Sequence, residues 1–431
     1  MTEGMRRVVL AIFIYGGFEG LVVNLFYPNT LAYLPKDVMI AITYFGLMSG
    51  VRSSSGSLTR FNGPAMVFAL LCVMSVALSL SVAPMGLAVA LKQRLFYIPL
   101  MFVGYHYTRG DADLARLLRV MAWFAIPVGL FGIYLYFGGP YTLKGMGAEY
   151  SHTFISTAGD AGIAFYRVPG TFNSPGQYGA FLMLTGTYLV GFLLVKDLRS
   201  SDRNLIIAAL ACILPALLAS GSRTPQLMFF IFSGVLALMS RQVGRAGVLA
   251  ALVYFLLIFS FDYFGAGVSD RVGSTFTQEN GDRFRATFFG QLFLPQLIAN
   301  PLGEGLGRAT IGARHFMSDD VELVESYLGL LATEMGVLGV VSFVVLAIVI
   351  GLQLVQARPW IKGAPAAPIW NAAFLLLLST LLLTANSTGL DSIPGNQYFW
   401  FFLGVAMKMV DMRRTQWMFD RVGEPARGPG G

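Results

Sequence analysis

Two arginines stand beside predicted helix starts, where they could help to bind an anion. Arg167 comes seven residues before Ser174, which can cap a helix whose first turn accommodates Pro175. Gln177 then completes a capping box with Ser174. Because the free N–H groups and the positive dipole end of a helix attract negative charge, this corner is a predicted anion-binding site. An ordinary capped helix, with Arg167 at the lipid headgroups, is the alternative.

Arg223 occupies a similar position within residues 220–226. Thr224 is expected to cap the helix there, with Pro225 as its first residue. A positive side chain beside the positive end of a helix dipole is best explained by a bound anion. Alternatively, Arg223 anchors the helix by extending to the lipid headgroups.

A third arginine, Arg285, lies in a segment whose apolar residues recur at helical spacing up to Pro295. One face of this predicted helix carries Phe284, Phe288, Phe289, Leu292 and Phe293. Arg285 falls near the middle of that face, and Arg283 lies on the opposite side. A helix on the membrane surface would direct Arg285 toward lipid or the protein interior, where a charge needs a partner such as phosphate. The alternative is an arginine that snorkels to the headgroups.

The glycine-rich residues 300–308 come next, and Arg308 and Arg314 are two further candidates for neutralising a diphosphate. The glycines permit a tight loop whose backbone can approach a ligand. The spacing matches no nucleotide-binding fingerprint, because no strand precedes the loop.

Two residues close to these arginines are candidates for a general base. Glu325 follows a possible helix cap formed by Asp319 and Glu322. It enters an apolar stretch, where burial would raise its pKa toward a value useful for proton abstraction. His315 is the competing candidate, and a structural role is the alternative for a single carboxylate such as Glu325.

The composition indicates that membrane helices position these residues. Of the 431 residues, 55% are hydrophobic and 12% charged, and the mean hydropathy is +0.65. A water-soluble fold of this length would lack the polar residues needed to cover its surface. The net charge is +7, but the basic residues lie at the ends of apolar runs, as membrane topology requires, so no nucleic-acid partner is expected.

Cysteine and histidine usage gives no sign of a metal centre. Cys72 and Cys212 fall inside apolar runs and are expected to be small buried hydrophobic residues. The three histidines, His106, His152 and His315, show no paired metal-ligand spacing. No metal and no other cofactor is therefore predicted.

Twelve apolar stretches are long enough to be membrane spans. They are residues 8–27, 37–51, 62–82, 94–108, 120–138, 176–195, 204–220, 225–240, 247–264, 330–356, 370–388 and 396–411. No small-residue cleavage site follows the first stretch, which is therefore predicted to remain as a span. The predicted fold is an all-α polytopic membrane protein with about twelve transmembrane helices and a large periplasmic loop.

The charge distribution predicts how the spans are oriented. With the N-terminus inside, the inner segments hold 18 of the 30 Lys and Arg residues and the outer segments hold 11. The positive-inside rule then places both termini in the cytoplasm and the long loops in the periplasm. The predicted parts are residues 1–264, a bundle of about nine spans with an outer loop at 139–175; residues 265–322, the large periplasmic loop; residues 323–411, the last three spans; and residues 412–431, a cytoplasmic tail.

Charged residues also occur within or next to the first two spans. Glu19 interrupts the first, and Lys36 and Asp37 stand at the start of the second. Charges in a membrane helix usually face a cavity or a partner. Pairing between these two helices is the expected explanation.

Five segments carry a resemblance to a known family, namely residues 167–175, 221–223, 285–307, 325–328 and 334–339. In this order they resemble the O-antigen ligase and O-antigen polymerase family of bacterial envelope glycosyltransferases, which includes exopolysaccharide polymerases. The resemblance implies a GT-C-like membrane fold in the bacterial inner membrane. It also implies metal-independent, inverting glycosyl transfer on the periplasmic face, from a glycan carried on undecaprenyl diphosphate. Arginines matching Arg223 and Arg285 would bind the diphosphate and stabilise the charge that develops as it leaves.

One departure from the ligase pattern favours a polymerase. Ligases of this family have a histidine before the late helical motif, whereas residues 323–328 contain none. In a polymerase, Glu325 or His315 would serve as the base, and the glycan acceptor would be a growing lipid-linked chain. In a ligase the acceptor would be lipid A core. Chain-length regulators and flippases are the protein partners that the resemblance suggests.

Two other classes of protein are alternatives to the enzyme. A transporter or lipid-glycan flippase would be expected to place charges deep in several spans and to have pseudo-symmetric halves. A non-catalytic assembly scaffold would keep the topology but would have no need of Arg223 and Arg285.

Overall fold

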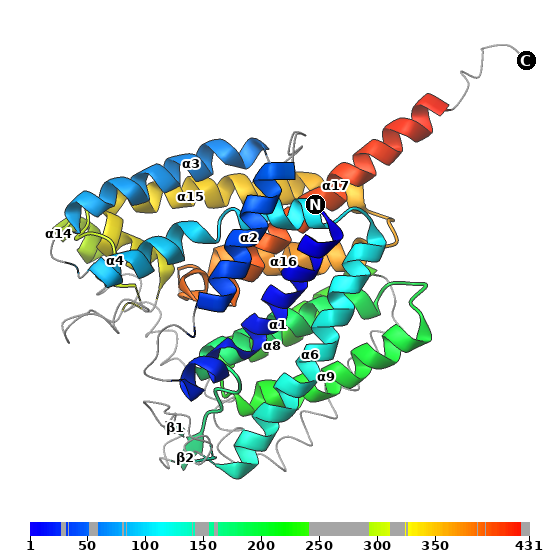
Figure 1. Cartoon of the computed structure of the whole chain (residues 1–431), viewed down its shortest axis with the longest axis horizontal. Coiled ribbons are helices and arrows are strands. Elements are labelled where there is room, and N and C mark those ends of the chain that lie inside the picture. Colours follow the sequence, from blue (N-terminus) through cyan, green and yellow to red (C-terminus); the bar gives the residue numbers. More distant parts are fainter. Residues whose placement is uncertain are drawn as a thin grey trace, which may run out of the picture.

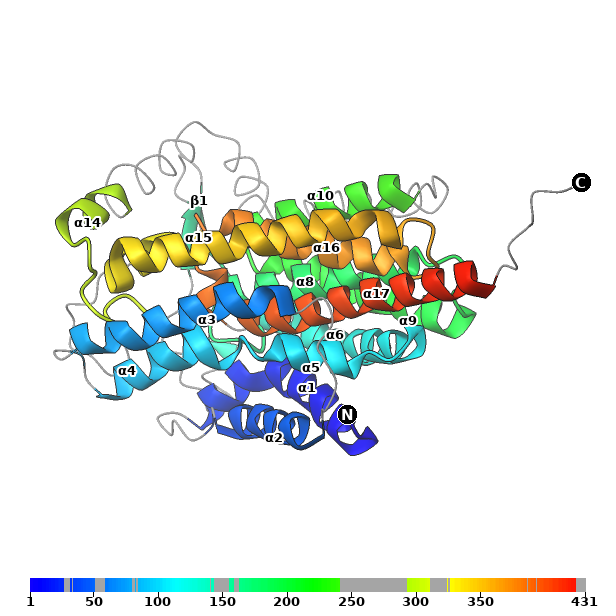
Figure 2. The same ribbon diagram turned by 90° about the horizontal axis from the view of Figure 1, so that it is seen from above.

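The computed structural model describes residues 1–26, 32, 34–50, 59–79, 82, 84–139, 141–142, 155–158, 163–240, 293–310, 324, 326–385, 387–392 and 394–423. This part of the chain is almost entirely helical. Its α-helices are α1 (Glu3–Leu25), α2 (Leu34–Gly50), α3 (Thr59–Met74), α4 (Pro84–Leu91), α5 (Leu100–Tyr107), α6 (Asp111–Gly138), α8 (Pro175–Leu193), α9 (Ser200–Ala219), α10 (Arg223–Ser240), α14 (Leu294–Ala299), α15 (Tyr327–Ile361), α16 (Ala367–Leu383) and α17 (Gly395–Gly423). Figures 1 and 2 show the long helices lying side by side in one bundle.

The architecture is that of a helical membrane protein, as predicted. Within the described residues, six helical segments are long and apolar enough to cross a membrane, namely α1, Pro84–Tyr107, α6, α9, α10 and α15. Asn62–Leu78 and α16 are apolar but shorter. Helices coincide with each predicted span except residues 247–264, which lie outside the described residues together with most of the predicted loop at 265–322.

Large apolar side chains cover the outside of the bundle. Phe45 and Met48 of α2 are 75% and 82% exposed, and Leu238 of α10 is 79% exposed. Apolar surface on this scale indicates contact with lipid in place of water.

Ion pairs gather several helix ends at one end of the bundle, here called the basic end. Arg6 of α1 bonds to Asp113 of α6 at 2.6 Å, and Arg119 of α6 lies 3.4 Å from Asp202 of α9. Arg413, near the end of α17, lies 3.8 Å from Asp111. The starts of α1, α6 and α9 therefore lie beside the end of α17.

The opposite end, here called the loop end, collects the starts of other helices. Leu21 N, near the end of α1, donates to Thr171 O at 2.8 Å, and Tyr327 N of α15 donates to Ser387 O at 3.1 Å. Asn396 Nδ2 of α17 donates to Gln93 O at 2.7 Å. In Figure 2 this end, with β1 and α14, lies to the left, away from the C-terminus.

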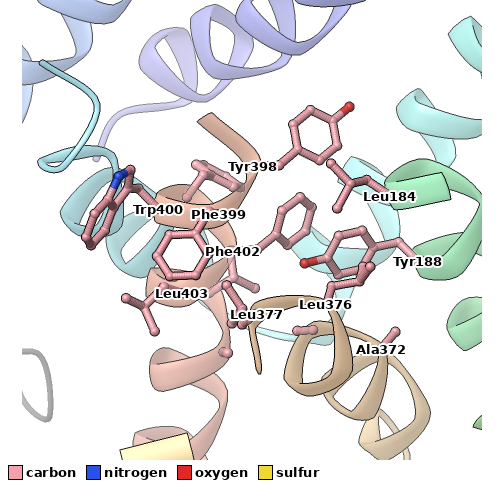
Figure 3. Packing of buried hydrophobic residues seen from close by; sticks show 14 of the residues in the cluster. Leu184, Tyr188, Ala372, Leu376, Leu377, Tyr398, Phe399, Trp400, Phe402 and Leu403 are labelled. Carbon is pink, nitrogen blue, oxygen red and sulfur yellow. The ribbon is translucent and has the colours of Figure 1, made fainter. Parts of the chain in front are cut away.

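Aromatic side chains fill the core between α8, α16 and α17. The rings of Tyr188 and Phe402 stack with their centroids 3.9 Å apart. Figure 3 shows Leu376 and Leu377 of α16 beside this pair. Close packing of this kind is the main attraction between helices in lipid, because apolar burial alone gives little advantage there.

Glycines allow α5 and α17 to touch backbone to backbone. A Cβ on Gly404 of α17 would lie 1.8 Å from Met101 O, and one on Gly104 of α5 would lie 2.0 Å from Phe401 O. Small residues at such a crossing let two membrane helices approach closely. Since the atoms in the way belong to the backbone, a larger residue would force the helices apart.

Gly404→Ala is expected to lower the stability of the purified protein by about 1–3 kcal/mol, because the added methyl overpacks this crossing. Thermal unfolding in detergent would measure the effect. Gly234→Ala in α10 is the matched control, since a Cβ there meets nothing within 4 Å. Equal melting temperatures for the two variants would contradict the prediction.

One feature differs from the purely helical prediction. Residues of the predicted outer loop form a short antiparallel hairpin, β1 (Ile155–Ala158) with β2 (Ile163–Tyr166), in which Ile155 is opposite Tyr166. β-Branched and aromatic residues favour this pairing.

The helix that was predicted to end at Pro295 lies outside the described residues except for its last positions. Pro295 itself lies in the first turn of α14, where a proline needs no N–H partner.

Candidate functional site

The segment that carries Arg167 is anchored across α1. Leu21 N donates to Thr171 O at 2.8 Å, and the Thr171 hydroxyl donates to Gly17 O. A regular helix would join Leu21 N to Gly17 O directly, so Thr171 supplies a partner to both groups. Val168 N also donates to Ala219 O of α9 at 3.1 Å. These bonds hold the residues that directly follow Arg167 against α1 and α9.

The start of α8 agrees with the sequence prediction. Ser174 is the N-cap, and its hydroxyl accepts a hydrogen bond from Gln177 N at 3.3 Å. Pro175 is the first helical residue. The free N–H groups of this first turn therefore lie at the loop end.

The start of α10 lies two residues earlier than predicted. α10 begins at Arg223, so Thr224 is inside the helix and is not its cap. The reason is that Ser222 O accepts the first helical bond, from Gln226 N at 3.2 Å. The Gln226 side chain also donates to Leu217 O at 3.0 Å and so fastens the first turn of α10 to the end of α9.

Ser222 joins the two helix starts and Arg167. Its hydroxyl donates to Pro175 O at 2.9 Å and accepts from Arg167 Nη2 at 3.4 Å. Arg167 and Arg223 are thus neighbours beside the first turns of α8 and α10, as the two predicted anion-binding corners would require if they form a single site.

The electrostatics of this corner favour a negatively charged ligand. Burial, together with the positive charge of Arg223, lowers the pKa of Arg167 from its ordinary value. Within the described residues Arg167 forms no ion pair, and its Nε is buried without a hydrogen-bond partner. Two neighbouring guanidinium groups at two positive helix ends would be stabilised by an anion between them.

The other predicted site residues are placed as follows. Arg308 belongs to the glycine-rich loop, which lies against α15. Four further predicted residues lie outside the described residues, namely Arg285, Arg314, His315 and Glu325. The described α15 begins at Tyr327 with Ser326 as its cap, whose hydroxyl accepts from Gly329 N at 2.9 Å.

A buried charge cluster at the loop end was not predicted. Arg94 donates to Asp391 Oδ1 at 2.6 Å and to Glu334 Oε2 at 3.0 Å, and all three side chains are fully buried. The guanidinium carbon of Arg94 also lies 4.9 Å from the centre of the Tyr327 ring. Arg94, Glu334 and Asp391 are called the Arg94 cluster below.

Glu334 connects the Arg94 cluster to the glycine-rich loop. Its Oε1 accepts from Gly307 N at 2.9 Å, Ala309 N at 3.2 Å and Thr310 N at 2.9 Å. The Thr310 hydroxyl donates to the same oxygen at 2.8 Å. The loop that carries Arg308 is therefore wrapped around one carboxylate.

The same loop enters a kink in α15. Gly336 has φ 60° and ψ −153° inside a helix that is otherwise continuous. Val337 N donates to Pro301 O at 2.9 Å, and a Cβ on Gly336 would lie 2.1 Å from that oxygen. Only glycine combines this backbone conformation with this space. The predicted span at 330–356 is therefore broken at its seventh residue.

The sequence does indicate that two members of the Arg94 cluster have buried partners. Glu334 stands within an apolar stretch, and Arg94 follows another. Charges in such places usually have partners within the protein. The sequence does not say which partners, because Arg94 and Asp391 are separated by 297 residues.

The predicted pairing of the first two helices is confirmed. Lys36 Nζ lies 2.7 Å from both Glu19 carboxylate oxygens, in the buried contact of α1 with α2. Asp37 instead pairs with Lys92 at 2.5 Å. Lys92 and Arg94 belong to a π-helical turn, Lys92–Phe96, which directs them to different partners. Such turns are frequent at functional sites.

The two cysteines and the possible metal ligands were also predicted to have no role in a metal site. Cys72 is buried, as predicted, with its Sγ 3.7 Å from Met335 Sδ, while Cys212 is only partly buried. Across the residues that the structure describes, no three His, Cys, Asp or Glu side chains gather as a metal site would require.

Comparison with protein-family models and with curated proteins gives no match to this chain.

Glu334→Gln is expected to lower the unfolding free energy by about 1–3 kcal/mol, because the glutamine amide has only one acceptor oxygen and leaves a buried donor of Arg94 or of the loop without its partner. It should also make the glycine-rich loop easier to cleave. Thermal unfolding and limited proteolysis followed by mass spectrometry would measure both effects.

Glu304→Gln is the matched control for this change. Glu304 is exposed and accepts only side-chain bonds from Gln296 and Asn300, each at 2.7 Å. Its effect should stay within about 0.5 kcal/mol. If both variants unfold and are cleaved alike, the Arg94 cluster does not hold the loop.

Proposed function

We propose that this protein is a membrane glycosyltransferase that polymerises oligosaccharide repeat units carried on undecaprenyl diphosphate. The reaction takes place on the periplasmic face of the bacterial inner membrane. It is inverting and independent of metal ions, and its products are O-antigen or exopolysaccharide chains. Transfer to lipid A core by an O-antigen ligase is the alternative reaction for the same donor site.

The observation that carries the proposal is that Arg167 and Arg223 are neighbours at the starts of α8 and α10. A diphosphate presents several negative oxygens, which suits two guanidinium groups and two helix N-termini better than a single phosphate contact would. In the proposed reaction these groups bind the donor and stabilise the charge that develops on the leaving diphosphate.

The proposed topology agrees with the two ends of the bundle. The basic end would face the cytoplasm, where positive charge is normally retained, and the loop end would face the periplasm. The membrane would then separate the site from the nucleotide sugars and ATP of the cytoplasm. A lipid-linked donor is the activated sugar that remains accessible from that side.

In the proposed mechanism, the acceptor hydroxyl attacks the first sugar carbon of the donor as the bond to the diphosphate breaks. Glu325 or His315 takes the proton of the hydroxyl. The diphosphate leaves with its electron pair and is held by Arg167 and Arg223, with Arg285, Arg308 and Arg314 as further proposed ligands. Bond formation on the face opposite the leaving group inverts the sugar carbon.

The buried charges of the bundle bear on the flippase alternative. A lipid-glycan flippase would need polar groups along a path through the membrane. In the described residues, the Arg94 cluster and the Lys36–Glu19 pair lie toward the loop end, and each cation is paired with carboxylate within its own group. This arrangement stabilises helix contacts without providing such a path.

Arg167→Ala and Arg223→Ala are each expected to reduce glycan polymerisation at least about a hundredfold, because each removes charge stabilisation from the leaving diphosphate. Activity would be measured as long-chain glycan on gels from cells that express equal amounts of membrane-inserted variant. Arg203→Ala, an exposed residue at the basic end, is the control and should behave like the wild type. Wild-type glycan from both site variants would refute the site assignment.

Arg285 offers a matched comparison within the predicted surface helix. Arg285→Ala is expected to abolish glycan assembly, whereas Arg283→Ala should have little effect because Arg283 is predicted to point the opposite way. The same gel measurement and the same check of membrane levels apply. Equal activity of the two variants would remove Arg285 from the proposed donor site.

Deletion of the gene distinguishes the three candidate reactions. Single repeat units attached to core indicate the loss of a polymerase, the expected result. Long lipid-linked polymer with bare core would indicate a ligase. Single repeats retained on the cytoplasmic leaflet would indicate a flippase.

A further inference from the structure

A groove at the basic end is separate from the proposed donor site. It has a volume of about 820 Å³ and lies where the last turns of α17 pass the junction of α5 and α6. The charged and polar residues that matter for its chemistry are Tyr105, Arg109, Asp111, Lys408, Arg413 and Arg414. In Figure 1 this part of α17 extends beyond the other helices toward the C-terminus.

The groove carries an excess of positive charge. Four cationic side chains line it, against the two carboxylates of Asp111 and Asp411. The Asp411 carboxylate accepts a hydrogen bond from the Tyr105 hydroxyl at 2.8 Å, and Asp111 is 3.8 Å from Arg413. The ammonium group of Lys408 lies 4.8 Å from the centre of the Tyr105 ring. These internal contacts leave the groove positively charged overall.

Aromatic and apolar side chains stand beside the groove. The rings of Trp360 and Trp417 meet edge to face at 5.6 Å, and the Arg414 guanidinium lies 5.1 Å above Trp360. Met418 lines the groove, and both it and Phe419 are largely exposed. Tryptophan is enriched at the level of lipid headgroups, where one side of the ring is apolar and the other is wet.

We propose that this groove binds the headgroup of an anionic phospholipid. The phosphate would lie among Lys408, Arg413 and Arg414, with the acyl chains against the apolar surface near Trp417 and Met418. Basic pockets between membrane helices recognise anionic headgroups in this way. A soluble anion would use the positive charge but would gain nothing from the aromatic and apolar rim.

Lipid retention by the purified full-length protein tests the proposal. Native mass spectrometry would follow titration of the delipidated protein with cardiolipin, phosphatidylglycerol or phosphatidylcholine. The two anionic lipids are expected to bind at roughly tenfold lower concentration than phosphatidylcholine, because each nearby basic residue adds to the attraction. Equal retention of all three lipids would overturn the proposal.

Matched variants locate the binding. The double variant Arg413→Gln/Arg414→Gln should weaken retention of anionic lipid about tenfold, whereas Arg413→Lys/Arg414→Lys should largely keep it. Arg199→Gln/Arg203→Gln removes the same charge from exposed positions at the basic end outside the groove, and should bind like the wild type. Equal weakening by the two glutamine pairs would show general surface attraction and reject the groove.

Two further measurements keep the test decisive. If the Arg413→Gln/Arg414→Gln protein does not fold, Lys408→Gln replaces it, and unchanged anionic-lipid retention by that variant would count against the proposal. Glycerol 3-phosphate distinguishes a lipid from a soluble ligand. Displacement of cardiolipin by micromolar glycerol 3-phosphate would show a site for soluble anions and overturn the assignment, whereas continued retention supports it.

Discussion

The buried contact of Arg94 with both Glu334 and Asp391 is the interaction on which the loop end depends. Removing such charges from water costs several kcal/mol for each ion, and only close pairing with further hydrogen bonds offsets that cost. Arg94 is held between two carboxylates, while Glu334 accepts three backbone and one hydroxyl donor from the glycine-rich loop. Four elements must therefore assemble together: the π-helical turn, the loop, the kinked start of α15 and the turn at Asp391. If one of them is missing, a charged group inside the membrane is left without its partner.

The loop end uses arginine in two opposite ways. At Arg94 the protein supplies both negative partners itself, so the guanidinium serves the fold. At Arg167 the protein supplies a hydroxyl and a neighbouring positive charge, and in the proposed function the negative partner is the ligand. The Arg94 cluster holds the glycine-rich loop against α15. The corner between α8 and α10 brings two positive side chains together, and in the proposed function a diphosphate would balance their charge.

Features controlled by neighbouring residues could be predicted from the sequence. The lengths of the apolar stretches predicted the helices, and Ser174 followed by Pro175 predicted the start of α8. The pairing between α1 and α2 through Glu19 and Lys36 was expected because charges in a membrane need partners. The Arg94 cluster could not be predicted in the same way, because Arg94 meets residues 240 and 297 positions away. The kink at Gly336 also depends on a distant loop, and the start of α10 was displaced by Ser222, whose contacts reach α8.

The bonds of Thr171 to α1 have a consequence for how the protein is made. Gly17 precedes Thr171 by 154 residues, so α1 is synthesised long before Thr171. Until then Leu21 N and Gly17 O can bond to each other as in any helix, so the nascent segment can enter the bilayer with no backbone group unsatisfied. Thr171 then adds a hydrogen bond to each of these two groups, and the corner beside α8 can form without unwinding the helix that has already been inserted.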